Sequence, residues 1–225
     1  MAGLPSLPRV AVLGELDSEL PFDSPYIVKP RFGGSSIGIE IVEDRETAEV
    51  IVRTSVHMRE GAVIEPYIAE SSDLSIAIKT WPSVALSAIE RPTRGGSSSG
   101  LFDYSEKYLS GRGLAGAERE LPASLSADTE AEVRRAAEVV AKVLPVRSMH
   151  RLDFIERSGE VWVNEINTIP GAMAGYLWVD PHVSYEEIIN GMIDEADSWQ
   201  PKGFSTAGSD GTLLRSSGSI AGKLG

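Results

Sequence analysis

The stretch Arg151–Gly171, RLDFIERSGEVWVNEINTIPG, constrains the fold of this chain more than any other. Two runs rich in β-branched and aromatic residues lie on either side of Arg157-Ser158-Gly159, which is a turn signal. The pattern therefore predicts a β-hairpin. A three-residue loop with Gly159 in the left-handed conformation fits this spacing.

Side chains on a strand alternate between its two faces. The first strand thus carries Arg151 and Asp153 on one face, and the second strand carries Glu165 and Asn167 on one face. Residues directly opposite in an antiparallel pair lie on the same side. A loop with an odd number of residues would bring the two polar pairs together, whereas an even number would separate them.

A face with two carboxylates, an amide oxygen and a guanidinium suggests a metal site. Oxygen ligands suit a hard cation, Mg²⁺ or Mn²⁺, and an arginine beside the metal suits a phosphoryl group. The other face is expected to pack in the core through apolar side chains, namely Leu152, Phe154, Trp162 and Ile166. The alternative is an exposed polar face on an ordinary hairpin.

Three segments of the chain carry recognisable motifs: Lys29-Pro30 with Gly33-Gly34-Ser35-Ser36-Ile37-Gly38, then Tyr104-Ser-Glu-Lys-Tyr-Leu109, and Asn164-Glu-Ile-Asn-Thr-Ile-Pro-Gly171. In this order along the chain, they resemble the motifs of the D-alanine–D-alanine ligase family of the ATP-grasp superfamily. The resemblance covers roughly residues 4 to 197. It implies an α+β protein with the ATP-grasp fold, in which two subdomains with antiparallel sheets clasp a nucleotide.

The domain boundaries are expected at two places. Residues 1–68 would form the smaller subdomain with the Gly/Ser phosphate loop, and residues 69–200 the larger one with the metal-binding hairpin. Residues 201–225 are rich in Gly and Ser with little periodicity, so a disordered tail is expected there. Helical spacing and capping residues predict helices over Arg45–Ser55 and Asp128–Leu144.

The resemblance implies a role for each matching residue around ATP and two Mg²⁺ (or Mn²⁺) ions. The metal ligands would be Asp153, Glu165 and Asn167. The nucleotide contacts would be Lys29, Ser35, Ser36, Glu65, Ile68, Asp73, Lys107 and Phe154. The catalytic groups would be Arg151, the Gly171 main-chain amide, and Ser35 with Tyr108, which close a loop over the substrates.

The implied activity is that of an ATP-dependent carboxylate–amine ligase, which forms a dipeptide for peptidoglycan through an acyl phosphate. One departure concerns the acceptor, because Tyr176 stands before Leu177 where the family usually has a smaller hydroxyl residue, often serine. Two alternatives therefore stay open. One is an ATP-grasp ligase that joins other amino acids in natural-product assembly, and the other is a non-catalytic ATP-binding module.

Composition narrows the expected partners. The formal net charge of −12 argues against a nucleic-acid partner, which needs a basic surface. The chain has no cysteine, and no apolar run approaches the length of a membrane span. A cytoplasmic protein that binds ATP and small amino acids is expected. The family's N-terminal domain, which supplies part of the first substrate's site, has no counterpart here, so the expected protein partners are that missing domain or a second copy of the chain in a homodimer.

Overall fold

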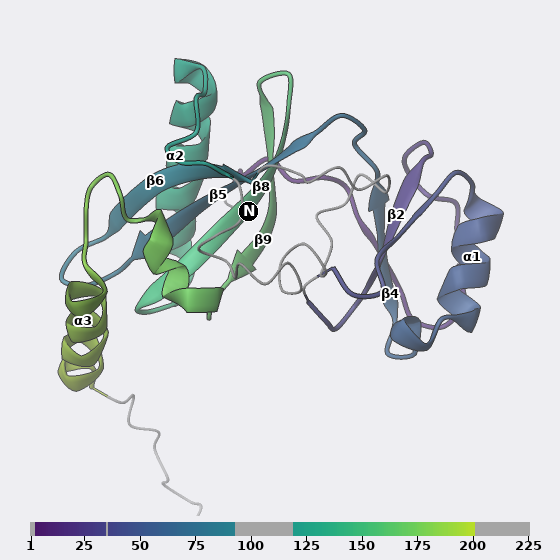
Figure 1. Ribbon diagram of the computed structural model, residues 1–225. Helices are drawn as coiled ribbons and strands as arrows, with labels where there is room; N and C mark the ends of the chain where they lie inside the picture. The colour runs from purple at the N-terminus through teal and green to yellow at the C-terminus, as the bar shows by residue number, and fades with distance from the viewer. Residues whose placement is uncertain (1–2, 35, 93–118, 201–225) are drawn as a thin grey trace, which may run out of the picture. The chain divides into compact units, whose positions relative to one another are not determined.

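The computed structural model of the chain describes residues 3–34, 36–92 and 119–200. The predictions made for Ser35, Lys107, Tyr108 and the tail 201–225 therefore lie outside the described residues. The described residues form two antiparallel sheets with helices packed on them (Figure 1). This arrangement confirms the predicted α+β class.

The first sheet has four strands in the order β1-β4-β2-β3. Helix α1 (Arg45–Thr54) packs on it through Ala48 and Val52. The helix begins where predicted, since the Asp44 side chain accepts a hydrogen bond of 2.7 Å from the Thr47 amide. The strands are β1 (Val10–Val12), β2 (Tyr26–Pro30), β3 (Glu40–Val42) and β4 (Ala62–Pro66).

The second sheet has five strands in the order β7-β6-β5-β8-β9. The predicted hairpin forms its end, as β8 pairs with β9 in antiparallel fashion. β9 is the last strand of this sheet. On its outer edge, the Val163 amide donates to the Pro5 carbonyl at 2.9 Å, so one backbone group of the edge strand is hydrogen-bonded. The strands are β5 (Ser72–Lys79), β6 (Ala85–Pro92), β7 (Arg119–Glu120), β8 (Met149–Arg157) and β9 (Glu160–Asn167).

Helix α2 (Ala127–Val143) covers one face of the five-stranded sheet (Figure 1). It begins one residue before the predicted helix because Ser126 is the N-cap, accepting from the Thr129 amide at 3.1 Å. Its apolar stripe packs on fully buried strand residues, among them Leu74, Ile76, Ile78, Leu152 and Phe154.

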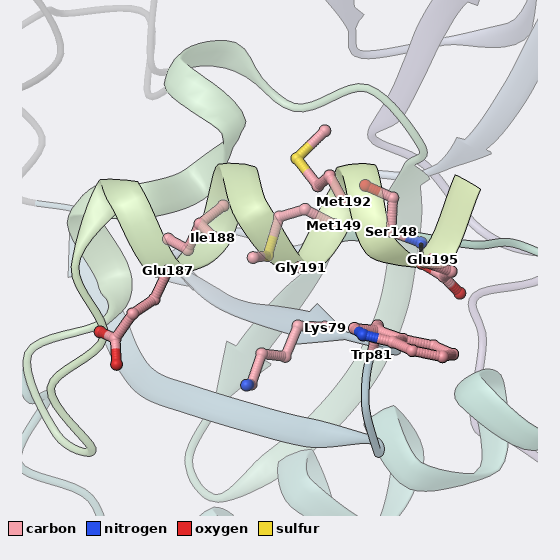
Figure 2. Close-up of a pocket in the computed structure, with 9 residues that line it drawn as sticks. All are labelled: Lys79, Trp81, Ser148, Met149, Glu187, Ile188, Gly191, Met192 and Glu195. Atoms are coloured by element: carbon pink, nitrogen blue, oxygen red, sulfur yellow. Dashed lines mark hydrogen bonds between the residues drawn. The ribbon is translucent and has the colours of Figure 1, made fainter. Parts of the chain in front are cut away.

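The opposite face of this sheet carries a short 3₁₀ segment, η4 (Gly171–Leu177), and helix α3 (Tyr185–Ser198). Leu177, Trp178 and Ile188 bury themselves there against Ala77 and Met149. A hollow of about 10 Å³ lies beneath α3, with room for about one water molecule, and Figure 2 shows the side chains that line it. None of the nine residues that line it is a predicted site residue. Among the helices of residues 3–34, 36–92 and 119–200, none has the length and apolarity to span a bilayer.

The Gly/Ser loop after β2 offers a matched pair of glycines for a stability test. Gly38 has φ of +75°, and a Cβ there would lie 2.6 Å from the Cβ of His57, whereas a Cβ on Gly34 would meet nothing within 4 Å. We expect Gly38→Ala to destabilise the chain by about 2 kcal/mol through the left-handed backbone and the contact with His57. Gly34→Ala should change stability by less than about 0.5 kcal/mol. Urea unfolding of both variants checks this, and equal midpoints for the two would contradict it.

Candidate functional site

The turn between β8 and β9 differs from the prediction. Arg157 pairs with Glu160, so the loop consists of Ser158 and Gly159 alone. Both residues have positive φ, 52° and 88°, which is the backbone of a tight two-residue hairpin turn. The predicted three-residue loop is therefore wrong, and an even loop by itself would place the two polar pairs on opposite faces.

A β-bulge restores the predicted face. The register shifts between Asp153, which pairs with Glu165, and Phe154, which pairs with Val163, so Asn164 is the extra residue. Beyond the bulge Arg151 pairs with Asn167, and the four polar side chains share one face. The bulge also corrects the predicted apolar face. Near the turn Val161 and Val163, rather than Trp162, pack in the α2 core.

The shared face carries a row of polar side chains that crosses four strands. Ser75 on β5 pairs with Glu90 on β6 and with Asp153 on β8, and Asp153 pairs with Glu165 on β9. Glu90 and Ser75 are buried, whereas Glu165 is exposed. Three carboxylates thus lie in register on neighbouring strands, with a hydroxyl between the first two.

Asp153 is the centre of this row because each of its two carboxylate oxygens accepts two hydrogen bonds. Oδ1 accepts from Ser75 Oγ at 2.8 Å and Arg151 Nε at 2.6 Å, and Oδ2 accepts from Arg151 Nη2 at 2.8 Å and Asn167 Nδ2 at 2.7 Å. Burial works to lower the pKa of Arg151, but the hydrogen bonds and charge of Asp153 outweigh it and raise that pKa. Arg151 and Asp153 thus form a bidentate ion pair, the geometry that best fixes the orientation of a guanidinium group.

The donor set fits a hard cation such as Mg²⁺. Asn167 Nδ2 bridges the two carboxylates, since it donates to Asp153 and also to Glu165 Oε1, the latter at 3.1 Å. These two carboxylates and the amide oxygen are ligands of the kind that Mg²⁺ takes, completed by water and phosphate. Within the ranges that the structure describes, no three His, Cys, Asp or Glu side chains gather into a metal-binding group. Protein oxygens alone would leave the coordination incomplete.

The bulge residue Asn164 also contacts a lysine of the four-stranded sheet. Lys29, near the end of β2, donates to Glu65 Oε2 at 2.7 Å and to Asn164 Oδ1 at 3.2 Å. Glu65 is 2% exposed and also lies 3.3 Å from Arg9 Nε, so its charge is compensated by two cations. Lys29 thus hydrogen-bonds to the unpaired residue of the bulge itself.

The remaining predicted residues divide into three groups. Ser36, Ile68 and Asp73 are half-buried, with Asp73 paired to Ile155 of β8, and Gly171 is exposed at the start of η4. Phe154 is 1% exposed in the α2 core, on the face opposite Asp153, so it is not brought to the polar face. Ser35, Lys107 and Tyr108 lie outside the described residues.

Three further residues adjoin the polar row and were not singled out for this role from the sequence. Glu90 accepts from the Tyr176 hydroxyl at 3.1 Å and from Arg119 Nη1 at 2.8 Å. The Arg119 guanidinium also stacks 4.5 Å above the Tyr176 ring. Burial raises the pKa of Glu90 although Arg119 and Tyr176 oppose the shift. Side chains alternate between the two faces along β6, and the pairing of β6 with β5 places Glu90 on the same face as Ser75. This alternation is the sequence signal that could have pointed to Glu90.

Tyr176 reaches this position through an unusual backbone. Ala172, Met173 and Ala174 have φ of 49°, 52° and 50°, a left-handed run that costs roughly 1–2 kcal/mol per residue. The run is held by the Met173 amide, which donates to the Pro170 carbonyl at 3.0 Å, and by the Tyr185 hydroxyl, which donates to the Ala172 carbonyl at 3.3 Å. The Tyr185 ring fills the space that a Cβ on residue 175 would need.

Comparison with known proteins identifies the family. Residues 11–194 match the family model described as the D-Ala D-Ala ligase C-terminus. The chain is 30% identical over 173 residues to the D-alanine–D-alanine ligase of Thermosipho africanus, which is 76% of this chain and 46% of that protein. This chain therefore belongs to the D-alanine–D-alanine ligase family. It spans about half the length of the curated relatives it matches.

Solved structures agree with this assignment. The D-alanine–D-alanine ligase of Helicobacter pylori superposes with a TM-score of 0.61 at 27% identity, over 88% of this chain and 57% of that one. The ligase of Bacillus anthracis solved with ATP gives 0.62 at 19% identity, over 85% and 60%. The two antiparallel sheets thus have the ATP-grasp fold, as predicted.

Tyr176 should report on its surroundings by titration. Burial, followed by the negative charge of Glu90, raises its pKa from 10.0 to about 12. The folded state therefore disfavours the phenolate. The stability that the neutral Tyr176 hydroxyl contributes is complete below pH 10.0 and is lost as the pH rises through about 12. The tyrosinate absorbance of the folded chain should show a late component that Tyr176→Phe removes and Tyr26→Phe keeps. A titration unchanged in Tyr176→Phe would contradict this.

Proposed function

We propose that this chain carries the ATP and metal site of an ATP-dependent carboxylate–amine ligase of the D-alanine–D-alanine ligase type. The observation that carries the proposal is the polar face of the β8–β9 hairpin, which brings the side chains of Asp153, Glu165 and Asn167 together beside Arg151. Family membership and the ATP complex of the Bacillus anthracis ligase support ATP as the nucleotide. ATP and amino-acid substrates suit a cytoplasmic location.

The proposed reaction has two steps. A substrate carboxylate attacks the γ-phosphorus of ATP and displaces ADP, which gives an acyl phosphate. The amine of a second substrate then attacks the acyl carbon, and inorganic phosphate leaves. In such phosphoryl transfer the protein contributes positioning and charge stabilisation. With D-alanine in both places the product is the dipeptide used for peptidoglycan.

Asp153, Glu165 and Asn167 would hold Mg²⁺, two ions by the family pattern, and the cation would offset the negative charge of the phosphates. Lys29 lies beside the hairpin through its hydrogen bond to Asn164, and its ammonium group is proposed to neutralise phosphate charge. Lys107 is proposed to neutralise the γ-phosphate in the same way. Ser36 with Ser35, together with Glu65, Ile68 and Asp73, would contact the nucleotide.

Arg151 is proposed to stabilise the developing oxyanion together with the Gly171 amide. Its two-pronged pair with Asp153 fixes the guanidinium on the metal face. Gly171 lies at the start of η4, where its exposed backbone is accessible to a substrate. Ser35 and Tyr108 would close the covering loop.

A specific observation favours a second candidate, a ligase that joins other amino acids. The Tyr176 hydroxyl donates to Glu90, so it does not offer its proton to an acceptor carboxylate as a free hydroxyl would. A screen of amino acids for ATP-dependent phosphate release separates the two candidates. D-alanine as the preferred acceptor supports the first, and preference for another amino acid supports the second. ATP binding without turnover in every mixture would instead indicate a non-catalytic module.

Glu165→Gln tests the metal face directly. Glu165 is exposed and, among the described residues, accepts one side-chain hydrogen bond, from Asn167, so the variant should lose less than about 0.5 kcal/mol of stability. Removing its charge should weaken Mg·ATP binding at least about tenfold, or about 1.4 kcal/mol, and abolish ATP turnover. Calorimetry with and without Mg²⁺ measures the affinity.

Glu160→Gln is the matched control, since Glu160 is an exposed glutamate on the same strand that pairs with Arg157 at the turn. It should bind Mg·ATP as the unmodified chain does. Equal affinity for Mg·ATP in Glu165→Gln and the unmodified chain would count against the proposed metal face.

A further inference from the structure

We propose that Arg9 is a positioning residue whose charge allows the Lys29 ammonium group to attract a phosphate. The two cations share one carboxylate, that of Glu65. Without Arg9, Lys29 and Glu65 would form a pair with no net charge, whereas with Arg9 the cluster carries one net positive charge. For nucleotide binding, though not for the geometry, this inference rests on the proposed function.

The register of the four-stranded sheet brings the three side chains to one face. Arg9 is the residue just before β1, and the antiparallel register of β1 with β4 places it opposite Glu65. Lys29 on β2 lies opposite Val63, which is two residues from Glu65 and therefore on the same face of β4. Helix α1 packs on the other face, where Ile64 is buried. The cluster thus lies on the face of this sheet away from α1.

The pairing of Glu65 divides its charge. Glu65 is buried, and a buried carboxylate destabilises the fold unless it is paired. Its Oε1 lies 3.3 Å from Arg9 Nε, and its Oε2 accepts from Lys29 Nζ at 2.7 Å. Each cation therefore has a carboxylate oxygen of its own, and neither displaces the other. Because one negative charge is divided between two cations, it neutralises neither of them fully.

Lys29 has a donor left for a ligand. An ammonium group carries three N–H donors. Within residues 3–34, 36–92 and 119–200, Lys29 donates to Glu65 and, at 3.2 Å, to Asn164 Oδ1. Its side chain is 21% exposed. A phosphate oxygen can therefore reach the third N–H group while both of these hydrogen bonds stay in place.

Arg9 is the more exposed of the two cations. Its side chain is 45% exposed, compared with 21% for Lys29. Water screens an ion pair that is exposed to this extent, so we expect a moderate effect of Arg9 on phosphate binding rather than a large one. The same exposure means that Arg9→Gln should fold as the unmodified chain does.

The test measures Mg·ATP affinity by calorimetry for Arg9→Gln, Glu65→Gln and the double variant of the whole 225-residue chain. We expect Arg9→Gln to weaken binding about fivefold, because the cluster becomes neutral. The double variant should return to within about twofold of the unmodified chain, because removal of the Glu65 charge restores the net positive charge. A role of Arg9 in the fold alone would not be rescued in this way.

Two variants and one ligand serve as controls. Arg9→Lys keeps the charge and should bind Mg·ATP as the unmodified chain does. So should Arg53→Gln, which removes the same charge from the exposed last turn of α1, on the other side of the sheet. Adenosine, which has no phosphate, should bind equally to Arg9→Gln and to the unmodified chain. Unchanged Mg·ATP affinity in Arg9→Gln, or a double variant as weak as Arg9→Gln, would overturn the proposal.

Failure of the proposed function is distinguishable from failure of this inference. If the unmodified chain binds no Mg·ATP, the proposed nucleotide site is contradicted for this chain. The ¹⁵Nζ–¹Hζ resonance of Lys29, assigned by its loss in Lys29→Met, then decides the inference without a nucleotide. We expect it to shift in Arg9→Gln, because the whole charge of Glu65 then acts on Lys29, and to stay in Arg53→Gln. An unshifted Lys29 resonance in Arg9→Gln would show that Arg9 does not share Glu65 with Lys29.

Discussion

The polar face depends on one irregularity, the extra residue Asn164 in β9. The two-residue turn fixes the register from Arg157–Glu160 inward, and without a bulge that register would direct Glu165 and Asn167 away from Asp153. The inserted residue reverses the alternation for the rest of the strand. It also leaves a side chain unpaired in the ladder, and that side chain accepts from Lys29. One residue thus sets both the metal face and a contact to the lysine of β2.

Charge compensation explains how the row of carboxylates can exist on a half-buried face. Glu90 is matched by Arg119 and Asp153 by Arg151, while the exposed Glu165 has solvent and the Asn167 amide. Each buried acid therefore has a guanidinium of its own, which offsets the desolvation that burial imposes. The exposed acid at the end of the row has no guanidinium partner in the part of the chain that the structure describes. It is the oxygen donor that a cation can reach with least rearrangement.

Local signals in the sequence were enough for much of the fold. Asp44 and the apolar spacing after it located α1, and the stripe of Val133, Ala137 and Val140 located α2, because capping and helical periodicity are local properties. The hairpin loop was different. A two-residue turn with a bulge and a three-residue loop without one bring the same side chains together. Alternation alone does not distinguish them. The predicted polar face therefore forms although the predicted loop is wrong, and Trp162 was assigned to the wrong face of the strand.

The pairing of Glu90, Arg119 and Tyr176 was beyond sequence reasoning for a related reason. These residues come from β6, β7 and η4, and they meet only because strand order places β6 beside β5 and because a left-handed run turns the chain after Gly171. The sequence Ala172-Met173-Ala174 does not predict a left-handed backbone, since glycine is the residue usually found in that conformation. The departure at Tyr176 was visible in the sequence, but its meaning was not. The side chain at the position that the family uses for its acceptor donates a hydrogen bond to a buried glutamate, a contact that depends on strands distant in the sequence.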